Sequence, residues 1–379
     1  MCELVRRSRE EIVQLLAGAD VGARKSVSDA VAAYGERLSA EMFAAVLNDN
    51  QVGATAVDSR SCIVTDDNYG CAAPLMKETF SSCRQELLPL VHTSHVPVLG
   101  GFVGATQKGN TTTLGRGGSD YTAAIVGAAI DADEIQIWTD VPGVLTADPR
   151  VASKARTVPF LSFEEAAELA YFGAKVLHPK TLHPAIERNI HVRICNSRNS
   201  NGRSTLVVAT TEKSPETVKA IAHKTGVTTV QVTSTRMLGA YGFLRALFEI
   251  FDRHRMAVDV VTTSEVSVSL SLDDTTGLQA VVEELEVLGS VNVEEKRAIV
   301  CVVGEGLRTT PGIAGRIFST IRDINVSLIS QGASRINLTF AVEESRAAET
   351  VMRLHQEFFE NVEAAEDESV YERKLVAPV

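Results

Sequence analysis

Up to about residue 210, apolar positions with helical spacing alternate with short apolar runs. The helical periodicity predicts helices at residues 11–16, 31–47 and 73–90. The short runs predict strands at residues 55–58, 96–102, 134–139 and 191–196. Because strands that alternate with helices form parallel sheets with helices on both faces, this part of the chain is expected to be α/β. Ligands of such sheets bind in the loops at the carboxyl ends of the strands.

After a polar segment at residues 210–217, which has the composition of a linker, one pattern occurs twice. Its first copy predicts a strand at 229–234, a helix at 242–254, strands at 258–262 and 266–272, and a helix at 277–288. Its second copy predicts a strand at 299–303, a helix at 312–324, strands at 326–330 and 336–342, and a helix at 345–359. Gly242 and Gly312 occupy matching places before the first helix of each copy. The sequence therefore predicts a twice-repeated, ferredoxin-like β-α-β-β-α-β unit.

The length of 379 residues is too great for one ordinary core. With the change of pattern it predicts three domains, at residues 1–212, 213–295 and 296–379. A net charge of -11 disfavours general nucleic-acid binding, which needs a cationic surface. The six scattered cysteines lack metal-ligand spacing, so neither a zinc site nor a redox site is expected. The absence of a long apolar run or a signal-peptide pattern disfavours a membrane protein and predicts a cytoplasmic one.

A glycine-rich segment, Gly-Arg-Gly-Gly-Ser-Asp-Tyr-Thr-Ala-Ala, occupies residues 115–124. Glycines allow close backbone approach, and the free amides at the start of a helix favour anions. Ser119 and Asp120 are also residue types that cap a helix, so a plain glycine turn with an aspartate cap is an alternative. Arg116 favours an anion site, because a fixed guanidinium binds a carboxylate or phosphate through two hydrogen bonds.

Three further segments carry candidate chemistry. Thr139, Asp140 and Arg150 follow a predicted strand end, where an open sheet binds its ligand, although Asp148-Pro149 is also ordinary turn chemistry. Lys175 lies in Tyr-Phe-Gly-Ala-Lys-Val-Leu-His-Pro, residues 171–179, on an otherwise apolar helix where a solvated lysine is the alternative. Glu36 lies where residues 35–40 open a predicted helix, so it is either a first-turn partner of the helix dipole or a ligand for a substrate ammonium.

The segments GRGGSDYTA, TDVPGVLTADPR and FGAKVLHP, together with the two small repeats, resemble the aspartokinase family. The second segment is shared with related amino acid kinases and uridylate kinase, whereas the other two are more specific. The resemblance implies an α/β fold, with an amino-acid-kinase sheet sandwich followed by two ferredoxin-like ACT units. It also implies transfer of phosphate from ATP to the β-carboxylate of L-aspartate, the first step toward lysine, threonine and methionine, with Mg²⁺ bridging the phosphates.

The same resemblance assigns roles to individual residues. Arg116, Gly117 and Ser119 are expected to hold the α-carboxylate of aspartate, and Glu36 its ammonium group. Asp120 and Lys175 are expected to be the catalytic residues, with Asp120 also organising the substrate. The nucleotide is expected to lie against Thr139, Asp140, Arg150 and Lys175. No residue is assigned as a metal ligand.

The first ACT unit resembles those of the lysine-sensitive class. The residues that match its lysine site are Met237, Gly242, Phe243, Leu244, Asp259, Thr263, Ser264 and Glu265. Asp259 or Glu265 suits the ammonium of lysine and loop amides suit its carboxylate, although the same residues are also ordinary turn residues of an ACT unit. Ala240 stands where a serine is common. The resemblance therefore implies L-lysine as feedback effector and a homodimer or tetramer formed through the ACT units.

Two departures from the family pattern affect the expected activity. Leu145 stands where a tyrosine near the nucleotide is frequent. The Lys-Phe-Gly-Gly segment of the family's first strand, which holds the transferring phosphoryl group, does not occur in this sequence. The kinase sheet is therefore expected to be incomplete at its N-terminal side, with poor phosphate transfer. Two alternatives to an active kinase are a catalytically silent regulatory or partner subunit, and a truncated reading of a normal enzyme.

Overall fold

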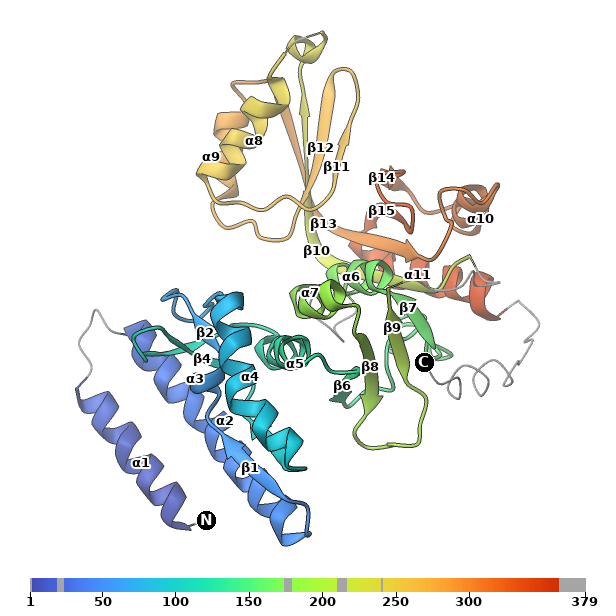
Figure 1. Ribbon diagram of the computed structural model, residues 1–379. Helices are drawn as coiled ribbons and strands as arrows, with labels where there is room; N and C mark the ends of the chain where they lie inside the picture. The colour runs from blue at the N-terminus through green and yellow to red at the C-terminus, as the bar shows by residue number, and fades with distance from the viewer. Residues whose placement is uncertain (1, 19–23, 174–178, 210–216, 240, 361–379) are drawn as a thin grey trace. The chain divides into compact units, whose positions relative to one another are not determined.

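The computed structural model describes residues 2–18, 24–173, 179–209, 217–239 and 241–360 (Figure 1). The chain divides into two compact units. The first comprises Met1–Asp140, Val176–Ser200 and Leu206–Thr210, and the second comprises Val141–Lys175, Asn201–Thr205 and Thr211–Val379. The mixed α/β fold predicted from the sequence is confirmed. The three predicted domain boundaries stay predictions.

Helices and short strands alternate in the first unit. Its helices are α1 (Cys2–Ala17), α2 (Arg24–Asp49), α3 (Ser59–Cys62), α4 (Met76–His92), α5 (Gly118–Ala129) and α7 (Pro179–Arg188). Its strands are β1 (Ala54–Val57), β2 (Val64–Thr65), β3 (Val96–Leu99), β4 (Val103–Thr106), β5 (Thr111–Thr113), β6 (Glu134–Thr139), β8 (His191–Asn196) and most of β9 (Thr205–Val208). The predicted strands at 134–139 and 191–196 coincide with β6 and β8.

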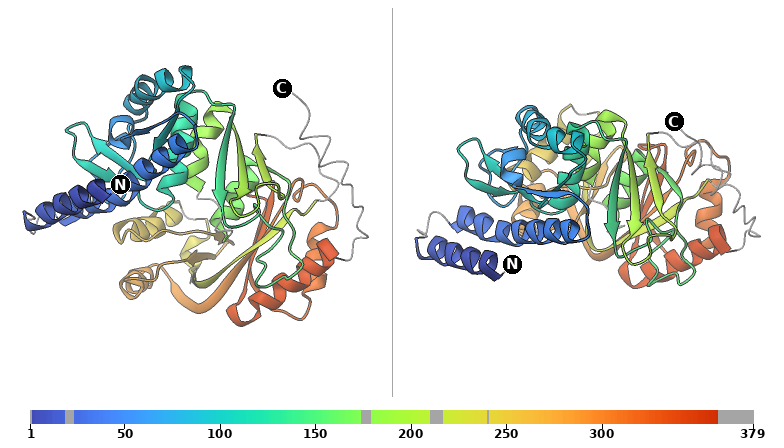
Figure 2. Two further views of the ribbon diagram at one scale, coloured as in Figure 1. Left: turned by 90° about the horizontal axis from the view of Figure 1, so that it is seen from below. Right: turned by 60° about the horizontal axis from the view of Figure 1, so that its bottom comes forward.

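The strand pairs of this unit are mostly parallel, as the alternation of helices and strands requires. β1 pairs with β3, β2 with β4 and β6 with β8 in parallel, whereas β4 and β5 form an antiparallel pair. A buried cluster that includes Cys62, Cys83, Leu87, Leu114 and Ile125 joins α3, α4 and α5. The helix α1 runs along α2 in both views of Figure 2. The hydroxyl of Tyr34 in α2 donates to Glu11 in α1 over 2.9 Å.

The second unit contains β7 (Phe160–Ser162), α6 (Phe163–Tyr171) and the two repeats. The first repeat contains β10 (Ala220–Thr233), the 3-10 turn η2 (Thr235–Met237), α8 (Phe243–Arg253), β11 (Val261–Thr263), β12 (Ser267–Leu272) and α9 (Leu278–Leu285). The second contains β13 (Ser290–Val303), α10 (Ile313–Thr320), β14 (Val326–Gln331), β15 (Asn337–Glu343), the 3-10 turn η3 (Glu344–Arg346), α11 (Ala347–His355) and the π turn η4 (Gln356–Glu360).

The repeats share one six-stranded antiparallel sheet, in the order β11-β12-β10-β13-β15-β14. β10 and β13 are each 14 residues long, more than twice the length of the predicted strands at 229–234 and 299–303. Residues 220–224 of β10 pair with 299–303, and its residues 229–233 pair with 290–294. The strand that completes the second repeat therefore comes from before the first. Figure 1 shows α8 and α9 on one face of β10–β12, where their apolar side chains form a separate buried cluster.

Candidate active site

The glycine-rich segment joins β5 to α5 through two left-handed glycines, Gly115 and Gly117, with φ of 75° and 73°. Gly117 is the N-cap of α5, and no side chain caps this helix. The expectation that Ser119 or Asp120 caps it was therefore wrong, because the helix already begins at Gly118 and places both residues in its first turn. The free amides of this turn, with the exposed Arg116 before it, suit an anionic ligand.

Glu36 lies in the middle of α2, which begins at Arg24. The interpretation of Glu36 as a first-turn partner of the helix dipole was therefore wrong, since the predicted start of this helix was several residues too late. The dipole acts mainly within the first turn and contributes little at this position. Glu36 is half-buried, and its side chain makes no hydrogen bond or ion pair with the described residues. It is thus available for a ligand cation.

Gly100 and Gly101 bring Glu36 and Ser119 to the same place. A Cβ atom at Gly100 would lie 2.9 Å from the backbone of Glu36, and one at Gly101 would lie 2.8 Å from Cα of Ser119. Glu36 and Ser119 therefore pack against adjacent residues, although they come from different helices. The prediction of a strand through residue 102 was wrong, because β3 ends at Leu99. The Gly-Gly pair after this apolar run was the sequence signal for a functional loop.

Hydrogen bonds fix the backbone around this glycine pair. The hydroxyl of Ser59 donates to the carbonyl of Gly100. Phe102 has a positive φ of 70° and donates its N–H to Oγ1 of Thr122 over 3.0 Å, while its carbonyl accepts from Leu114 N over 3.0 Å. These contacts join the glycine pair to α3, to α5 and to the segment that leads into Arg116.

Asp120, like Glu36, is a half-buried carboxylate. Burial raises its pKa above the ordinary aspartate value. Within the described part of the chain, the side chains of Arg116, Ser119 and Asp120 make no hydrogen bond or ion pair. The first unit therefore presents a guanidinium, a hydroxyl and two carboxylates, those of Glu36 and Asp120, that no other described group uses. The guanidinium can bind a carboxylate and a carboxylate can bind an ammonium group, so this set can bind a zwitterion.

Thr139 and Asp140 lie at the carboxyl end of β6, as the sequence predicted. β8 runs parallel to β6, and Thr139 is the register partner of Asn196. The carbonyl of Thr139 accepts from N of Ser197 over 2.8 Å and from its Oγ over 3.0 Å. The turn after β8 therefore lies beside Thr139. Asn196 and Ser197 are candidate site residues that the sequence interpretation missed.

Arg150 belongs to the second unit and is exposed there. Its Nη2 lies 2.6 Å from Oδ2 of Asp148, its Nε lies 3.0 Å from Oδ1, and its backbone N–H donates to Oδ1 over 2.9 Å. The Arg150 guanidinium lowers the pKa of Asp148. A phosphate that binds Arg150 would therefore compete with this pair. Lys175 and His178 lie outside the described residues.

Thr146, between Asp140 and Arg150 in the chain, connects this segment to the repeats of the same unit. Its carbonyl accepts from Ile221 N of β10 over 2.8 Å, and its hydroxyl lies 3.0 Å from Nε2 of the fully buried His355 of α11. Ala147 and Ala152 pack in the core cluster of the second repeat. The segment after Asp140 is thus part of the same packed unit as the repeats.

α6 is held at both ends within the second unit. Its N-cap Ser162 and Glu165 form a capping box, and Oε2 of Glu165 also lies 2.8 Å from Nζ of Lys219. At its other end, the hydroxyl of Tyr171 donates to a carboxylate oxygen of Asp259. Burial raises the pKa of Asp259. Asp259 is one of the predicted effector residues, so this site directly contacts the helix that precedes Lys175 in the chain.

The other predicted effector residues lie in two loops of the first repeat. Met237 ends η2, and Gly242 is the left-handed N-cap of α8, with Phe243 and Leu244 in its first turn. Thr263 ends β11, and Ser264 Oγ lies 2.7 Å from Ser267 Oγ in the turn to β12, which also contains Glu265. The residues at the start of α8 have free backbone amides. Thr263 ends the strand that follows Asp259, and Ser264 and Glu265 lie in the turn after it.

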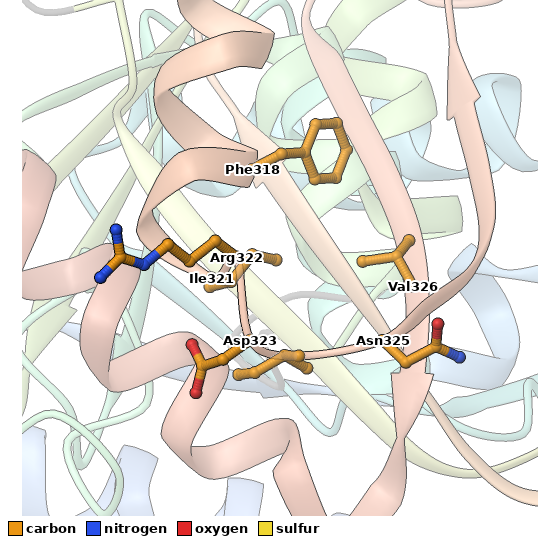
Figure 3. A pocket seen from close by; sticks show the side chains of 7 residues that line it. Phe318, Ile321, Arg322, Asp323, Asn325 and Val326 are labelled. Carbon is orange, nitrogen blue, oxygen red and sulfur yellow. The ribbon is translucent and has the colours of Figure 1, made fainter.

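A hollow of about 490 Å³ lies elsewhere, between the end of α10 and the start of β14 (Figure 3). Its lining residues are Phe318, Ile321, Arg322, Asp323, Ile324, Asn325 and Val326. None of them is a predicted site residue. Asp323 is already paired with Arg353 and, over 3.5 Å, with Arg346. Its charge therefore stabilises the second repeat, and we do not assign the hollow to the reaction.

Comparison with known proteins agrees with the fold. The profile of the amino acid kinase family matches residues 5–196, and that of the ACT domain matches residues 300–358. The fold and site therefore define an amino acid kinase with a regulatory region. The chain is 39% identical to lysine-sensitive aspartokinase 3 of Escherichia coli, over 94% of this chain and 81% of that protein. The chain belongs to the aspartokinase family.

A plant relative and two solved structures give the same relationship. The chain is 41% identical to the chloroplastic aspartokinase 1 of Arabidopsis thaliana, over 94% of this chain and 65% of the plant protein. Among solved structures, it resembles E. coli aspartokinase III in complex with aspartate and ADP in the R-state, with a TM-score of 0.82 and 39% identity over 94% of this chain and 81% of the other. It also resembles the lysine and aspartate complex of that enzyme in the T-state, with a TM-score of 0.76 and 40% identity over the same shares.

Proposed function

We propose that this chain is an aspartate kinase that transfers the γ-phosphoryl group of ATP to the β-carboxylate of L-aspartate. The observation that carries the proposal is the packing of Glu36 and Ser119 against the Gly100–Gly101 pair. Arg116 and Asp120 belong to the same glycine-rich segment as Ser119, and none of these four side chains is engaged by another described group. The related E. coli enzyme with 39% identity was solved with aspartate and ADP, which supports the same substrates here.

The α-carboxylate and the ammonium group of aspartate each have a suitable partner in the first unit. Arg116 would bind the α-carboxylate through two hydrogen bonds, assisted by the amide of Gly117 and the hydroxyl of Ser119. Glu36 would bind the ammonium group. Asp120, at the start of α5, would orient the bound substrate. Because phosphoryl transfer is catalysed mainly by positioning and charge neutralisation, these contacts would place the β-carboxylate for attack on the γ-phosphoryl group.

ATP would lie against Thr139 and Asp140 at the end of β6, with Arg150 and Lys175 on its phosphates. Mg²⁺ would accompany it. The described residues include no group of three or more His, Cys, Asp or Glu side chains that could hold a metal. Phosphate oxygens and water would therefore supply most of the magnesium ligands, as is usual for this ion, and would leave at most one or two to carboxylates.

We further propose that L-lysine binds the first repeat and inhibits the reaction. Asp259 and Glu265 would take its ammonium groups, and the amides at the start of α8 its carboxylate. The contact between Asp259 and Tyr171 supports a regulatory role, because it joins this loop to α6. The E. coli relative named lysine-sensitive aspartokinase 3 supports the choice of lysine.

Self-association through the ACT units, as a dimer or tetramer, is part of the proposal. Leu238, Tyr241, Leu244 and Phe248 leave large apolar side chains exposed around the start of α8, where a second copy would cover them. The proposed domains remain residues 1–212, 213–295 and 296–379. No described helix has the length and apolarity needed to cross a membrane. We propose that the protein acts in the cytoplasm.

Incubation of the purified chain with MgATP and L-aspartate tests the activity. Hydroxylamine traps an acyl phosphate, so aspartyl hydroxamate and ADP should form together and only when aspartate is present. Arg116→Ala is the matched inactive variant. If lysine raises the melting temperature of the protein but no hydroxamate forms, the alternative of a silent regulatory subunit replaces the proposal. A shift with threonine and none with lysine would contradict the choice of effector.

A further inference from the structure

Asp29 is a buried carboxylate in the first half of α2, with 4% of its surface exposed. It accepts three hydrogen bonds. Its Oδ2 accepts from the backbone N–H of Gly70 and of Thr113, both over 2.9 Å, and its Oδ1 accepts from the hydroxyl of Thr113 over 3.0 Å. Hydrogen bonds of this kind offset the cost of burying the ionised form of a carboxylate.

These bonds fasten two segments that meet at the glycine-rich loop. Thr113 is the last residue of β5 and is followed by Leu114, Gly115 and Arg116. Gly70 lies in the turn beside that loop, because a Cβ atom at Gly115 would lie 3.1 Å from its carbonyl oxygen. Asp29 therefore holds both the strand that leads into Arg116 and the turn that lies against Gly115.

The same helix carries the proposed ammonium ligand. Asp29 lies seven residues before Glu36, which is about two helical turns, so both side chains project from one face of α2. Glu36 in turn packs against Gly100. The distance between Arg116 and Glu36 is therefore set through α2, with Asp29 as the link to the Arg116 loop.

We propose that Asp29 is a positioning residue of the substrate site, which holds the Arg116 loop against α2 at the separation that aspartate requires. This inference rests on the proposed function. In this proposal Asp29 does not contact the substrate. Its loss should weaken the binding of aspartate and leave the binding of nucleotide unchanged.

Two substitutions separate the hydrogen bonds of Asp29 from its charge. In Asp29→Asn, the amide oxygen can accept from both backbone N–H groups, and the NH₂ group can donate to the Thr113 hydroxyl. In Asp29→Ala, all three bonds are lost and two N–H groups are left without a partner. Asp66→Ala is the matched control. Oδ1 of Asp66 accepts from N of Asn68 and of Ala73 in the turn that contains Gly70, and these two bonds do not reach β5 or α2.

Calorimetric titration with L-aspartate and hydrogen exchange of the intact chain test the proposal. We expect Asp29→Ala to raise the aspartate dissociation constant by about tenfold or more and to speed exchange at residues 113–117, with the MgATP constant unchanged. Asp29→Asn and Asp66→Ala should stay within about threefold of wild type. An Asp29→Ala protein that binds aspartate like wild type, or an equal loss in Asp66→Ala, would overturn it.

Two further outcomes are decided by the same experiments. If Asp29→Ala does not fold, Thr113→Val decides, because it removes only the hydroxyl contact. A rise of about threefold in the aspartate constant supports the proposal, and an unchanged constant overturns it. If wild type itself does not bind aspartate, the proposed function fails. Hydrogen exchange at residues 113–117 then still shows whether Asp29 holds this loop.

Discussion

The hydroxyl of Tyr171 donates a hydrogen bond to the carboxylate of Asp259. Nζ of Lys224 lies 3.8 Å from Oδ2 of Asp259 and 5.2 Å from the centroid of the Tyr171 ring, and it also pairs with Asp273. A polar cluster thus joins the last residue of α6 to the proposed lysine site. An effector ammonium that binds Asp259 must share this carboxylate with Tyr171 or displace it.

Tyr171→Phe should therefore tighten the binding of lysine, because the tyrosine hydroxyl no longer competes for Asp259. A hydrogen bond to a charged group contributes enough to shift the lysine dissociation constant by roughly tenfold. Calorimetric titration with L-lysine measures this dissociation constant. Tyr34→Phe, which removes the contact with Glu11 in the first unit, is the control. An unchanged lysine constant in Tyr171→Phe would show that the contact plays no part in effector binding.

The pair between Glu165 and Lys219 should be the most important ion pair of α6 for stability. Their side chains are 1% and 6% exposed, and the Nζ–Oε2 distance is 2.8 Å. Lys219→Met leaves the Glu165 carboxylate buried without its cation, which should lower the free energy of unfolding by about 3–5 kcal/mol. Urea unfolding measures this loss. Arg245→Met breaks the exposed pair with Glu249 on α8 and should have no measurable effect. Equal losses in the two variants would contradict the prediction.

Asp120→Asn should stabilise the protein at neutral pH. Burial raises the folded-state pKa of Asp120, so the folded protein binds a proton more readily than the unfolded chain does. The contribution of Asp120 to stability therefore falls as the pH rises through its folded-state pKa. The gain in melting temperature from Asp120→Asn should be largest at pH 7 and shrink as the pH falls toward the ordinary aspartate value. A lower melting temperature for Asp120→Asn at neutral pH would contradict this account.

Gly101→Ala should strongly weaken aspartate binding without unfolding the protein. Its Cβ would lie 2.8 Å from Cα of Ser119, so the start of α5 must move away from residue 101. A displacement of this size costs on the order of 100-fold at a site that depends on geometry.

Gly35→Ala is the control for this substitution. It adds a methyl group beside Glu36 where no atom lies within 4 Å. Because alanine favours a helix more than glycine does, this variant should gain about 0.5–1 kcal/mol of stability and bind aspartate normally. Normal binding by Gly101→Ala would show that the glycine pair does not set the site.

Periodic and apolar segments were predicted well from the sequence. The strands β6 and β8 and the helices α8 and α10 followed from local patterns, since each buries one apolar face. The pairing of residues 220–224 with 299–303 could not be predicted. It joins segments far apart in the chain, and neither carries a turn signal that specifies its partner.

Site chemistry was predictable where a motif was contiguous. Arg116 and Ser119 came from one glycine-rich segment, whereas Asp29 had no local signal. Asp29 is one polar residue in a helix, and its role depends on Gly70 and Thr113, which only the folded chain brings to it. The helix start was misplaced because residues 24–29, which are polar except for Val27, gave no apolar periodicity. Because of this error, Glu36 was given a first-turn role as its alternative.

Titration of the intact protein with L-aspartate, followed by calorimetry, tests most directly whether Arg116 is the carboxylate clamp of an aspartate site. Wild type should bind one aspartate per chain. Arg116→Ala should show no measurable binding, and Arg116→Lys should recover only part of it, because a single ammonium cannot form the two parallel hydrogen bonds of a guanidinium. Equal aspartate affinities for Arg116→Ala and wild type would contradict the assignment of the site to this loop.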